Sequence, residues 1–571
     1  MVDESRMSSA HVAAAVLVEV LAEQGVRHAV VSPGSRNAPM VLALHHHPEI
    51  KVRVSLDERA AAHHALGIAL ATWRPVPVVC TSGTAAINHG PALAEAYHSR
   101  IPLMSVTADR PAHALHRGHG QTIDQTHLHA PHTVHHATLD ASLMTQEELT
   151  QEARSAVHQS LYGGPGQSAG PVHLNVPFEE PLYELGPVPS IAQGPEIKAR
   201  GWAEVPATAV DMPVPLAQFL ARGKVLVVAG PRPVAASSLP DTRLTTALPC
   251  LAEASAGVHG PLTVEGGDRL LKDGQWPSNL QPEAILTLGL PVMSKALRKS
   301  FEGIPHWHIG EDQLHEGKGW DTWMELRGNA PAHALRSNPN RSFGEEWHHA
   351  CEAMHEAHKA FSPSWSDLQA WNGMVETWKH LGPNKRPSAL HVANSASARY
   401  MQWVKVKEGL QEGAALHANR GVAGIDGCTS TALGWHAARR EMNPEATTWL
   451  VTGDLAFHYD SNAMLTDPLD ANIGLKVVVM NNGGGGIFRW LPGTKHEDAF
   501  VRHFETPSAR RVEDLAKAMN AVYCCAKNEG QLRKGIEALA DEPQFAVLEI
   551  QTPPVESAAQ LSRYLQSFGI K

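Results

Sequence analysis

Short apolar runs alternate with segments of helical periodicity from the start of the chain. Residues 10–24 and the segment ERAAAHHALGIALAT (58–72) have the apolar spacing of helices. The sequences HAVVSPGSR, VPVVCTSGTAA and PLMSVTADRP are apolar runs that end in turn residues. Because these runs lack the alternation of a strand with one face in water, they predict parallel strands covered by helices on both faces.

The same pattern occurs twice more. A second series contains KVLVVAGP (224–231), AILTLGLP (284–291) and PHWHIGED, and it fades through a helical region rich in Trp and His at 345–380. A third series begins at SALHVANSAS (388–397) and continues through TTWLVTGD, LKVVVMNNG and FAVLEIQTPP. The Pro- and Gly-rich stretch 184–200 is typical of a linker. We therefore predict an α/β protein with three doubly wound parallel-sheet domains, at 1–185, 200–350 and 380–571.

Composition narrows the class of protein. The 571 residues include 43% hydrophobic and 19% charged residues, which is typical of a globular protein. The formal charge of −10 disfavours a nucleic-acid groove or an anionic membrane as partner. No apolar run approaches the roughly 20 residues that span a bilayer. The six cysteines form no C-x-x-C pair, so we expect reduced thiols and a cytoplasmic location.

Polar residues follow two of the apolar runs in the third series. Asp454 comes directly after one, and Asn481, Asn482 and the glycines 483–486 come after the next. Carboxyl ends of parallel strands meet at one sheet edge, where carboxylate, amide and carbonyl oxygens suit Mg²⁺. The glycines would let the backbone approach a diphosphate. Either feature alone is an ordinary turn signal, so the prediction of a metal and diphosphate site depends on the two features occurring together.

This pair carries a family resemblance. A Gly-Asp followed about 27 residues later by Asn-Asn is the signature of thiamin-diphosphate enzymes, and here Asn481 and Asn482 lie 27 and 28 positions after Asp454. The segments GDLAFHYDSNAM and NNGGGGIFRWLP resemble the SEPHCHC synthase (MenD) family within that superfamily. So do SPGSRNAP, DERAAAHHALGIA, TSGTA, TADRP, GPVHLNVPFEEPLY and NRGVAGIDG, which extend the resemblance nearly end to end.

The resemblance implies thiamin diphosphate with Mg²⁺ or Mn²⁺ as cofactors. A count back from Ile487 and Phe488 makes Asp454, Asn482 and the Gly484 carbonyl the metal ligands. A count forward from Asp454 gives Asn481 and Gly483 instead. We prefer the backward count, because the resemblance implies that the loop LTDPLDANIGLK is one residue longer than is usual in the family. Surface loops absorb such insertions.

Glu58 matches the glutamate that activates the cofactor in this family through a hydrogen bond to its pyrimidine ring. From the residues alone, an acid at the start of a helix is ordinary, because it favours the helix dipole. The superfamily brings this glutamate and the metal site together from different subunits, which implies a homodimer or homotetramer with active sites at the interface. The resemblance also assigns cofactor contacts to Ser82, Ile425, Gly453, Leu455 and Ile487.

The family decarboxylates 2-oxoglutarate and adds the succinyl semialdehyde carbanion to isochorismate in a 1,4-addition, giving SEPHCHC and CO₂ in menaquinone biosynthesis. Substrates with several carboxylates require cations and hydrogen-bond donors. Two segments depart from the family pattern, VANS for G-N-S and GHGQ for G-A-N-Q, and neither removes a charged group. The implied substrate contacts are Arg36, Arg110, Gln121, Lys295, Ser395, Arg399 and Arg420, with Ile487 and Phe488 as an apolar wall.

Three alternatives stay open. One is another thiamin-diphosphate lyase or synthase of the acetolactate-synthase type, and another is a non-catalytic homologue, against which Glu58 and Asp454 speak. The third is a separate metal site among the eight histidines at 113–136. No cysteine lies nearby and the chain has 35 histidines, so we favour ordinary loop and surface histidines at the rim of the active site.

Overall fold

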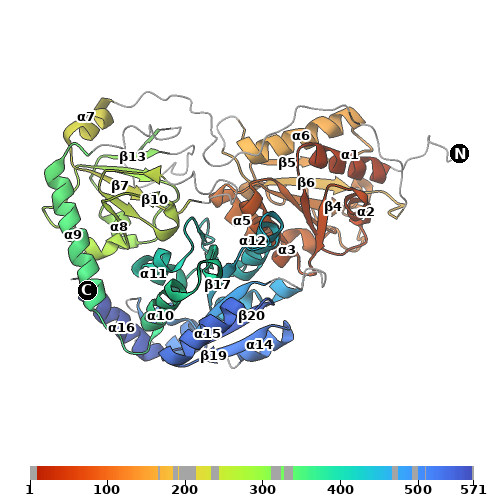
Figure 1. Ribbon diagram of the computed structural model, residues 1–571. Helices are drawn as coiled ribbons and strands as arrows, with labels where there is room; N and C mark the ends of the chain where they lie inside the picture. Colours follow the sequence, from red (N-terminus) through yellow and green to blue (C-terminus); the bar gives the residue numbers. More distant parts are fainter. Residues whose placement is uncertain are drawn as a thin grey trace.

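The computed structural model describes residues 9–164, 168–183, 191, 214–232, 244–309, 323–326, 338–465, 474–491, 499–507 and 510–568. It contains three six-stranded sheets, each built from a successive part of the chain and each parallel throughout. This confirms the predicted fold class. We refer to the N-terminal, central and C-terminal units (Figure 1). The expected linker 184–200 lies outside the described residues except for Ile191, and the exact domain limits stay predictions.

The N-terminal unit has the strand order β2-β1-β3-β4-β6-β5. Its strands are β1 (His28–Val31), β2 (Lys51–Val54), β3 (Val76–Cys80), β4 (Leu103–Asp109), β5 (His135–Thr138) and β6 (Val172–Pro177). Its helices are α1 (Ser9–Glu23), α2 (Ala38–His46), α3 (Glu58–Thr72), α4 (Thr84–Ile87), α5 (Gly90–Ser99) and α6 (Gln146–Tyr162).

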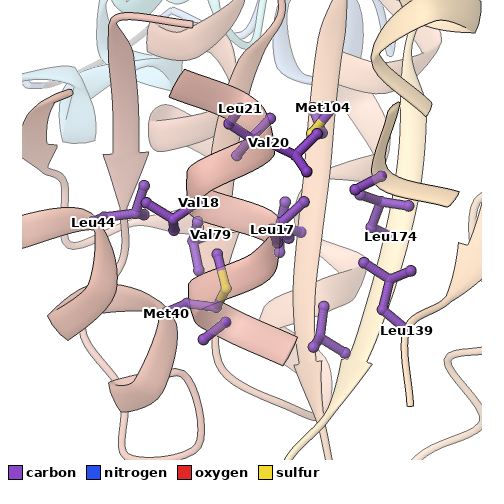
Figure 2. Close-up of a cluster of buried hydrophobic side chains, with 14 of the residues drawn as sticks. Leu17, Val18, Val20, Leu21, Met40, Leu44, Val79, Met104, Leu139 and Leu174 are labelled. Carbon is purple, nitrogen blue, oxygen red and sulfur yellow. The ribbon is translucent and has the colours of Figure 1, made fainter. Parts of the chain in front are cut away.

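The core of this unit follows from its apolar runs. Every residue of β3 and β4 is buried, as expected for strands covered on both faces. Leu17 and Leu21 of α1 lie in one buried cluster with Met104 and Leu174 of the sheet (Figure 2). This packing fixes the carboxyl ends of the strands, where the site is built.

The central unit has the order β11-β9-β7-β12-β13-β14, with a separate pair β10-β8. Its helix α9 runs along the side of the molecule toward α16 of the C-terminal unit (Figure 1), where His358 Nδ1 lies 2.8 Å from the Tyr564 hydroxyl. The strands are β7 (Val225–Ala229), β8 (Leu244–Thr245), β9 (Cys250–Ala252), β10 (Val258–His259), β11 (Thr263–Glu265), β12 (Ala284–Leu288), β13 (His306–Ile309) and β14 (Trp323–Leu326). The helices are α7 (Val214–Arg222), α8 (Lys295–Lys299) and α9 (Arg341–Ala360).

The C-terminal unit has the order β16-β15-β17-β18-β20-β19, which repeats the order of the N-terminal unit strand for strand. Its strands are β15 (Ala389–Val392), β16 (Ala415–His417), β17 (Thr448–Gly453), β18 (Lys476–Asn481), β19 (Val522–Ala526) and β20 (Ala546–Gln551). Its helices are α10 (Asp367–His380), α11 (Ala396–Trp403), α12 (Cys428–Met442), α13 (Asp454–Tyr459), α14 (Val512–Ala518), α15 (Glu529–Asp541) and α16 (Pro554–Gln566).

Helices α3 and α12 join the two outer units at very close range (Figure 1). A Cβ added to Gly67 would lie 2.0 Å from the Thr431 carbonyl oxygen, and one added to Gly434 would lie 1.9 Å from the His64 oxygen. Only glycine fits at these two positions, because both obstacles are backbone atoms.

Two further expectations concern membrane-spanning helices and the cysteines. Within the described ranges, no helix has the length and apolar character needed to cross a membrane. All six cysteines are free.

Candidate active site

The carboxyl ends of β17 and β18 bring the acidic and amide residues together, as the sequence predicts. These strands pair in parallel, with Gly453 opposite Met480, so Asp454 starts α13 beside Asn481 and Asn482. The Asp454 side chain is buried, and burial raises its pKa to about 7, although hydrogen bonds from the backbone N–H groups of Leu455 and Gly484 lower it. A buried carboxyl of this kind gains from a nearby cation.

The two asparagines differ in what holds them. Asn481 uses both ends of its amide, because Nδ2 donates to Glu549 and Oδ1 accepts the Gly483 N–H at 3.0 Å. Asn482 donates Nδ2 to the buried carboxyl of Asp367 at 2.7 Å. This bond turns the amide nitrogen toward Asp367 and the amide oxygen away from it.

The glycine loop after β18 is held tightly against residues 505–507. Gly484 has φ of +131°, and a Cβ there would lie 2.1 Å from the Glu505 carbonyl oxygen. Gly485 N–H donates to the same oxygen at 2.6 Å. Ile487 and Phe488 follow in the turn Gly486–Arg489, half-buried, and the Phe488 ring contacts Phe504. The loop thus places backbone groups and an apolar wall beside Asp454.

Glu58 is the first residue of α3, and its neighbours contact the segment after Asp454 in the same chain. Asp57 caps the helix by accepting the N–H groups of Arg59 and Ala60, and it also accepts Asn462 Nδ2 at 2.7 Å. The Arg59 guanidinium donates to the Tyr459 carbonyl at 3.0 Å. The Glu58 carboxyl itself is half-buried and accepts a long hydrogen bond of 3.5 Å from Asn88.

Ser82 lies in the loop between β3 and α4. It is 1% exposed, and its hydroxyl has no hydrogen-bond partner among the described residues. The next residue, Gly83, has φ of +85°, and a Cβ there would lie 3.2 Å from Cα of Gln121. Gln121, whose side chain is exposed, therefore packs against the Ser82 loop.

The expected substrate-binding cations form two groups. In the first, Arg36 is buried and donates to the Phe178 carbonyl at 2.8 Å and to Glu180 at 3.0 Å. Burial lowers the pKa of Arg36, and the positive charge of Arg110 lowers it further. Arg36 and Arg110 are therefore close neighbours.

The second group surrounds Asn394. Arg399 donates to the Ser395 carbonyl and Arg420 donates to Asn394 Oδ1, both at 2.8 Å. Burial lowers the pKa of Arg399, and the charge of Arg420 lowers it further. Asn394 also donates to the Gly424 carbonyl at 2.7 Å, which positions the loop that carries Ile425.

Acidic residues of the central unit, absent from the sequence prediction, border this second group. Glu253 is buried at the end of β9, accepts the Met293 N–H, and is near Arg420. Asp268 accepts a hydrogen bond from Ser294, the residue before Lys295, and its charge acts on Arg399. Lys295 is exposed at the start of α8, directly after the two residues that contact these acids.

Among the histidines at 113–136, some are buried or half-buried in the fold and others are exposed on the surface. Within the described parts of the chain, no group of three His, Cys, Asp or Glu side chains is placed to hold a metal ion. His129 is buried and donates to the Ala86 carbonyl at 2.9 Å, whereas His127 and His136 stack edge to face.

Comparison with known proteins agrees with this geometry. Residues 11–128 match the family described as thiamine pyrophosphate enzyme, N-terminal TPP binding domain, and residues 394–550 match the corresponding C-terminal TPP binding domain. Benzoylformate decarboxylase from Polynucleobacter necessarius has the same fold, with a TM-score of 0.70 over 95% of this chain and 98% of that chain at 14% identity. The fold and site thus define a thiamin-diphosphate-dependent enzyme.

The particular family follows from relatives matched over nearly the full length. The chain is 31% identical to 2-succinyl-5-enolpyruvyl-6-hydroxy-3-cyclohexene-1-carboxylate (SEPHCHC) synthase of Flavobacterium johnsoniae, over 96% of this chain and 98% of the relative. It is 32% identical to that of Porphyromonas gingivalis (96% and 96%) and 31% to that of Geobacillus kaustophilus (95% and 95%). The chain belongs to the SEPHCHC synthase family, which confirms the resemblance seen in the sequence.

Proposed function

We propose that the protein decarboxylates 2-oxoglutarate and adds the remaining four-carbon unit to isochorismate, giving SEPHCHC and CO₂ in menaquinone biosynthesis. The observation that carries this proposal is the match over 96% of the chain to a synthase of that name. The six free cysteines accord with a cytoplasmic setting, which is part of the proposal.

The described residues fit a divalent cation with a diphosphate. We assign Asp454, the Asn482 amide oxygen and the Gly484 carbonyl as ligands of Mg²⁺ or Mn²⁺, because hard oxygens suit these ions. The buried Asp454 carboxyl would gain the counter-charge it lacks, and Asn482 is already oriented by Asp367. When bound, thiamin diphosphate supplies an electron sink for breaking the bond to the departing carboxylate. A further proposed contact is the Ser82 hydroxyl, which has no hydrogen-bond partner in the described part of the chain. The others are Gly453, Leu455, Ile425 and Ile487.

Glu58 is the proposed acid that holds a proton toward the pyrimidine ring of the cofactor. A carboxyl group in a charge-assisted hydrogen bond favours the reactive tautomer of that ring. We propose a homodimer or homotetramer in which Glu58 of one subunit serves the metal site of another. The support is the superfamily arrangement and the exposure of part of the Glu58 side chain in the single chain.

The two cation groups would bind the carboxylates of the substrates. Arg36 and Arg110 are close neighbours in the N-terminal unit, where Gln121 packs against the Ser82 loop. Ser395, Arg399 and Arg420 form the second group, and Lys295 is assigned to it at the start of α8. Arginine suits this role because its planar fork matches a carboxylate. Ile487 and Phe488 would exclude water from the reacting carbon.

The test is a reaction of purified protein with thiamin diphosphate, Mg²⁺, 2-oxoglutarate and isochorismate. We expect both substrates to be consumed in equal amounts with one CO₂ released. Faster turnover of pyruvate alone would instead favour the acetolactate-synthase type. Cofactor binding without turnover of any 2-oxo acid would favour a non-catalytic homologue.

A further inference from the structure

A buried chain of side-chain amides crosses the N-terminal unit between the Ser82 loop and Arg110. Gln125 accepts the Gly83 N–H on Oε1 at 2.8 Å and donates Nε2 to Asn175 Oδ1 at 3.0 Å. Asn175 donates Nδ2 to Asp109 Oδ2 at 2.8 Å, and Asp109 Oδ1 accepts the Arg110 N–H at 2.7 Å. The bonds made by Gln125 and Asn175 join residues far apart in the sequence. The last bond joins two neighbouring residues at the end of β4.

The network is enclosed and nearly saturated. Gln125, Asn175 and Asp109 are 0%, 1% and 2% exposed. The second donor position of Gln125 is used by the Ala108 carbonyl at 3.2 Å, and Asn175 Oδ1 also accepts the Thr107 hydroxyl at 2.9 Å. In such a site an alternative side-chain orientation would leave buried polar groups unpaired, so the network holds a single arrangement.

Both ends of the network reach residues that the proposed function uses. At one end Gly83 follows Ser82 and packs against Gln121. At the other, Arg110 continues directly from Asp109, and the charge of Arg36 acts on Asp109, lowering its pKa against the larger upward effect of burial. Gln125 also reaches the end of β4 directly through the Ala108 carbonyl, whereas the contact with the Asp109 carboxyl runs through Asn175.

We propose that Gln125 and Asn175 are positioning residues that set the cofactor loop at Ser82 and the substrate-binding turn at Arg110 relative to each other. The inference rests on the proposed function for the identity of the ligands. Gln125 serves both branches, and Asn175 serves only the Arg110 branch.

Because Gln125 serves both branches and Asn175 only one, variants of the two residues should have different effects. The Asn175→Ala variant keeps the Gly83–Gln125 bond, so its Kd for thiamin diphosphate with Mg²⁺ stays within twofold of wild type. Its KM for one of the two substrates rises at least tenfold, while the KM for the other stays within twofold. The Gln125→Met variant shows the same rise in KM and also weakens thiamin diphosphate binding at least tenfold.

Ser160→Ala is the matched control. Its hydroxyl is buried in the same unit and donates to the Gly170 carbonyl at 2.9 Å, away from both loops. The variant loses one buried hydrogen bond and some thermal stability, but neither KM nor Kd changes. Unchanged KM values in Asn175→Ala overturn the inference, as does an equal loss of cofactor affinity in the Asn175 and Gln125 variants.

A measurement on the wild-type protein covers variants that fail to fold. Addition of thiamin diphosphate and Mg²⁺ slows amide hydrogen exchange at residues 109 and 110 as well as at 81–84. No change at 109 and 110 overturns the inference. Absence of turnover in wild-type protein would count against the proposed function, while the exchange and Kd measurements would still test the link between the loops.

Discussion

The contact between α3 and α12 gives the sharpest prediction about stability. In Gly434→Ala the new Cβ would start 1.9 Å from the His64 carbonyl oxygen, and contacts under 3.0 Å are essentially never observed. The helices must therefore separate by at least about 1.1 Å, since 3.0 − 1.9 = 1.1, and a backbone oxygen within a helix cannot rotate away.

The cost follows from the packing around this point. All residues from Ala60 to Ala71 of α3 are buried, so separation loosens the whole interface. Overpacking of a close-packed interior costs about 1–3 kcal/mol, and we expect the upper end of that range. Differential scanning calorimetry should show the first unfolding transition roughly 5–10 °C below that of wild type.

Two comparisons make this prediction refutable. Gly530→Ala places the same methyl group at an exposed position of α15, 3.6 Å from its nearest neighbour, and should raise stability by up to about 1 kcal/mol. Adding Gly67→Ala to Gly434→Ala should cost less than the sum of the single changes, because one displacement relieves both clashes. A Gly434→Ala protein that melts within 1 °C of wild type would show that the two units are not held by this contact.

Three further predictions concern chemistry and pH. Glu58→Gln should lower kcat by about 100-fold or more with little change in thiamin diphosphate affinity; undiminished turnover in a steady-state assay would refute its role. Asn482→Ala should weaken Mg²⁺ at least tenfold in cofactor-binding titrations and Asn481→Ala less, and the reverse order would establish the other register. Burial raises the pKa of Glu253 from 4.5 to about 7. The protonated carboxyl therefore contributes fully to stability below pH 4.5, and this contribution is lost as pH rises through 7. The free energy of unfolding should differ by roughly 3 kcal/mol between these two limits. Glu253→Gln should therefore gain stability relative to wild type between pH 5 and pH 8, whereas parallel calorimetric pH curves would contradict this.

The sequence was informative wherever one local pattern decided the outcome. Continuous apolar runs identified the central strands, and α3 begins and ends at the residues expected. Strands such as β2 and β19 were not predicted because they are short edge strands in which all residues but one are exposed or half-buried. Their identity depends on the neighbouring strand rather than on their own composition.

The site was predictable to the extent that motifs carry it. Spacing alone left Asn481 and Asn482 as alternatives, and the contacts to Glu549 and Asp367 that separate them arise from distant parts of the chain. Glu253 and Gln125 gave no sequence signal, because their importance lies in contacts made after folding, across units or between strands and loops.

The shared strand order of the outer sheets bears on how the enzyme arose. The common order is what duplication of a single α/β unit would produce. The helix equivalent to α3 now begins with Cys428 after Gly427, so it carries no acid matching Glu58. Conversely, β3 is followed by the loop with Ser82, whereas β17 is followed directly by Asp454, the first residue of α13. Each half therefore carries one of the two groups and neither carries both, so the proposed site needs both halves.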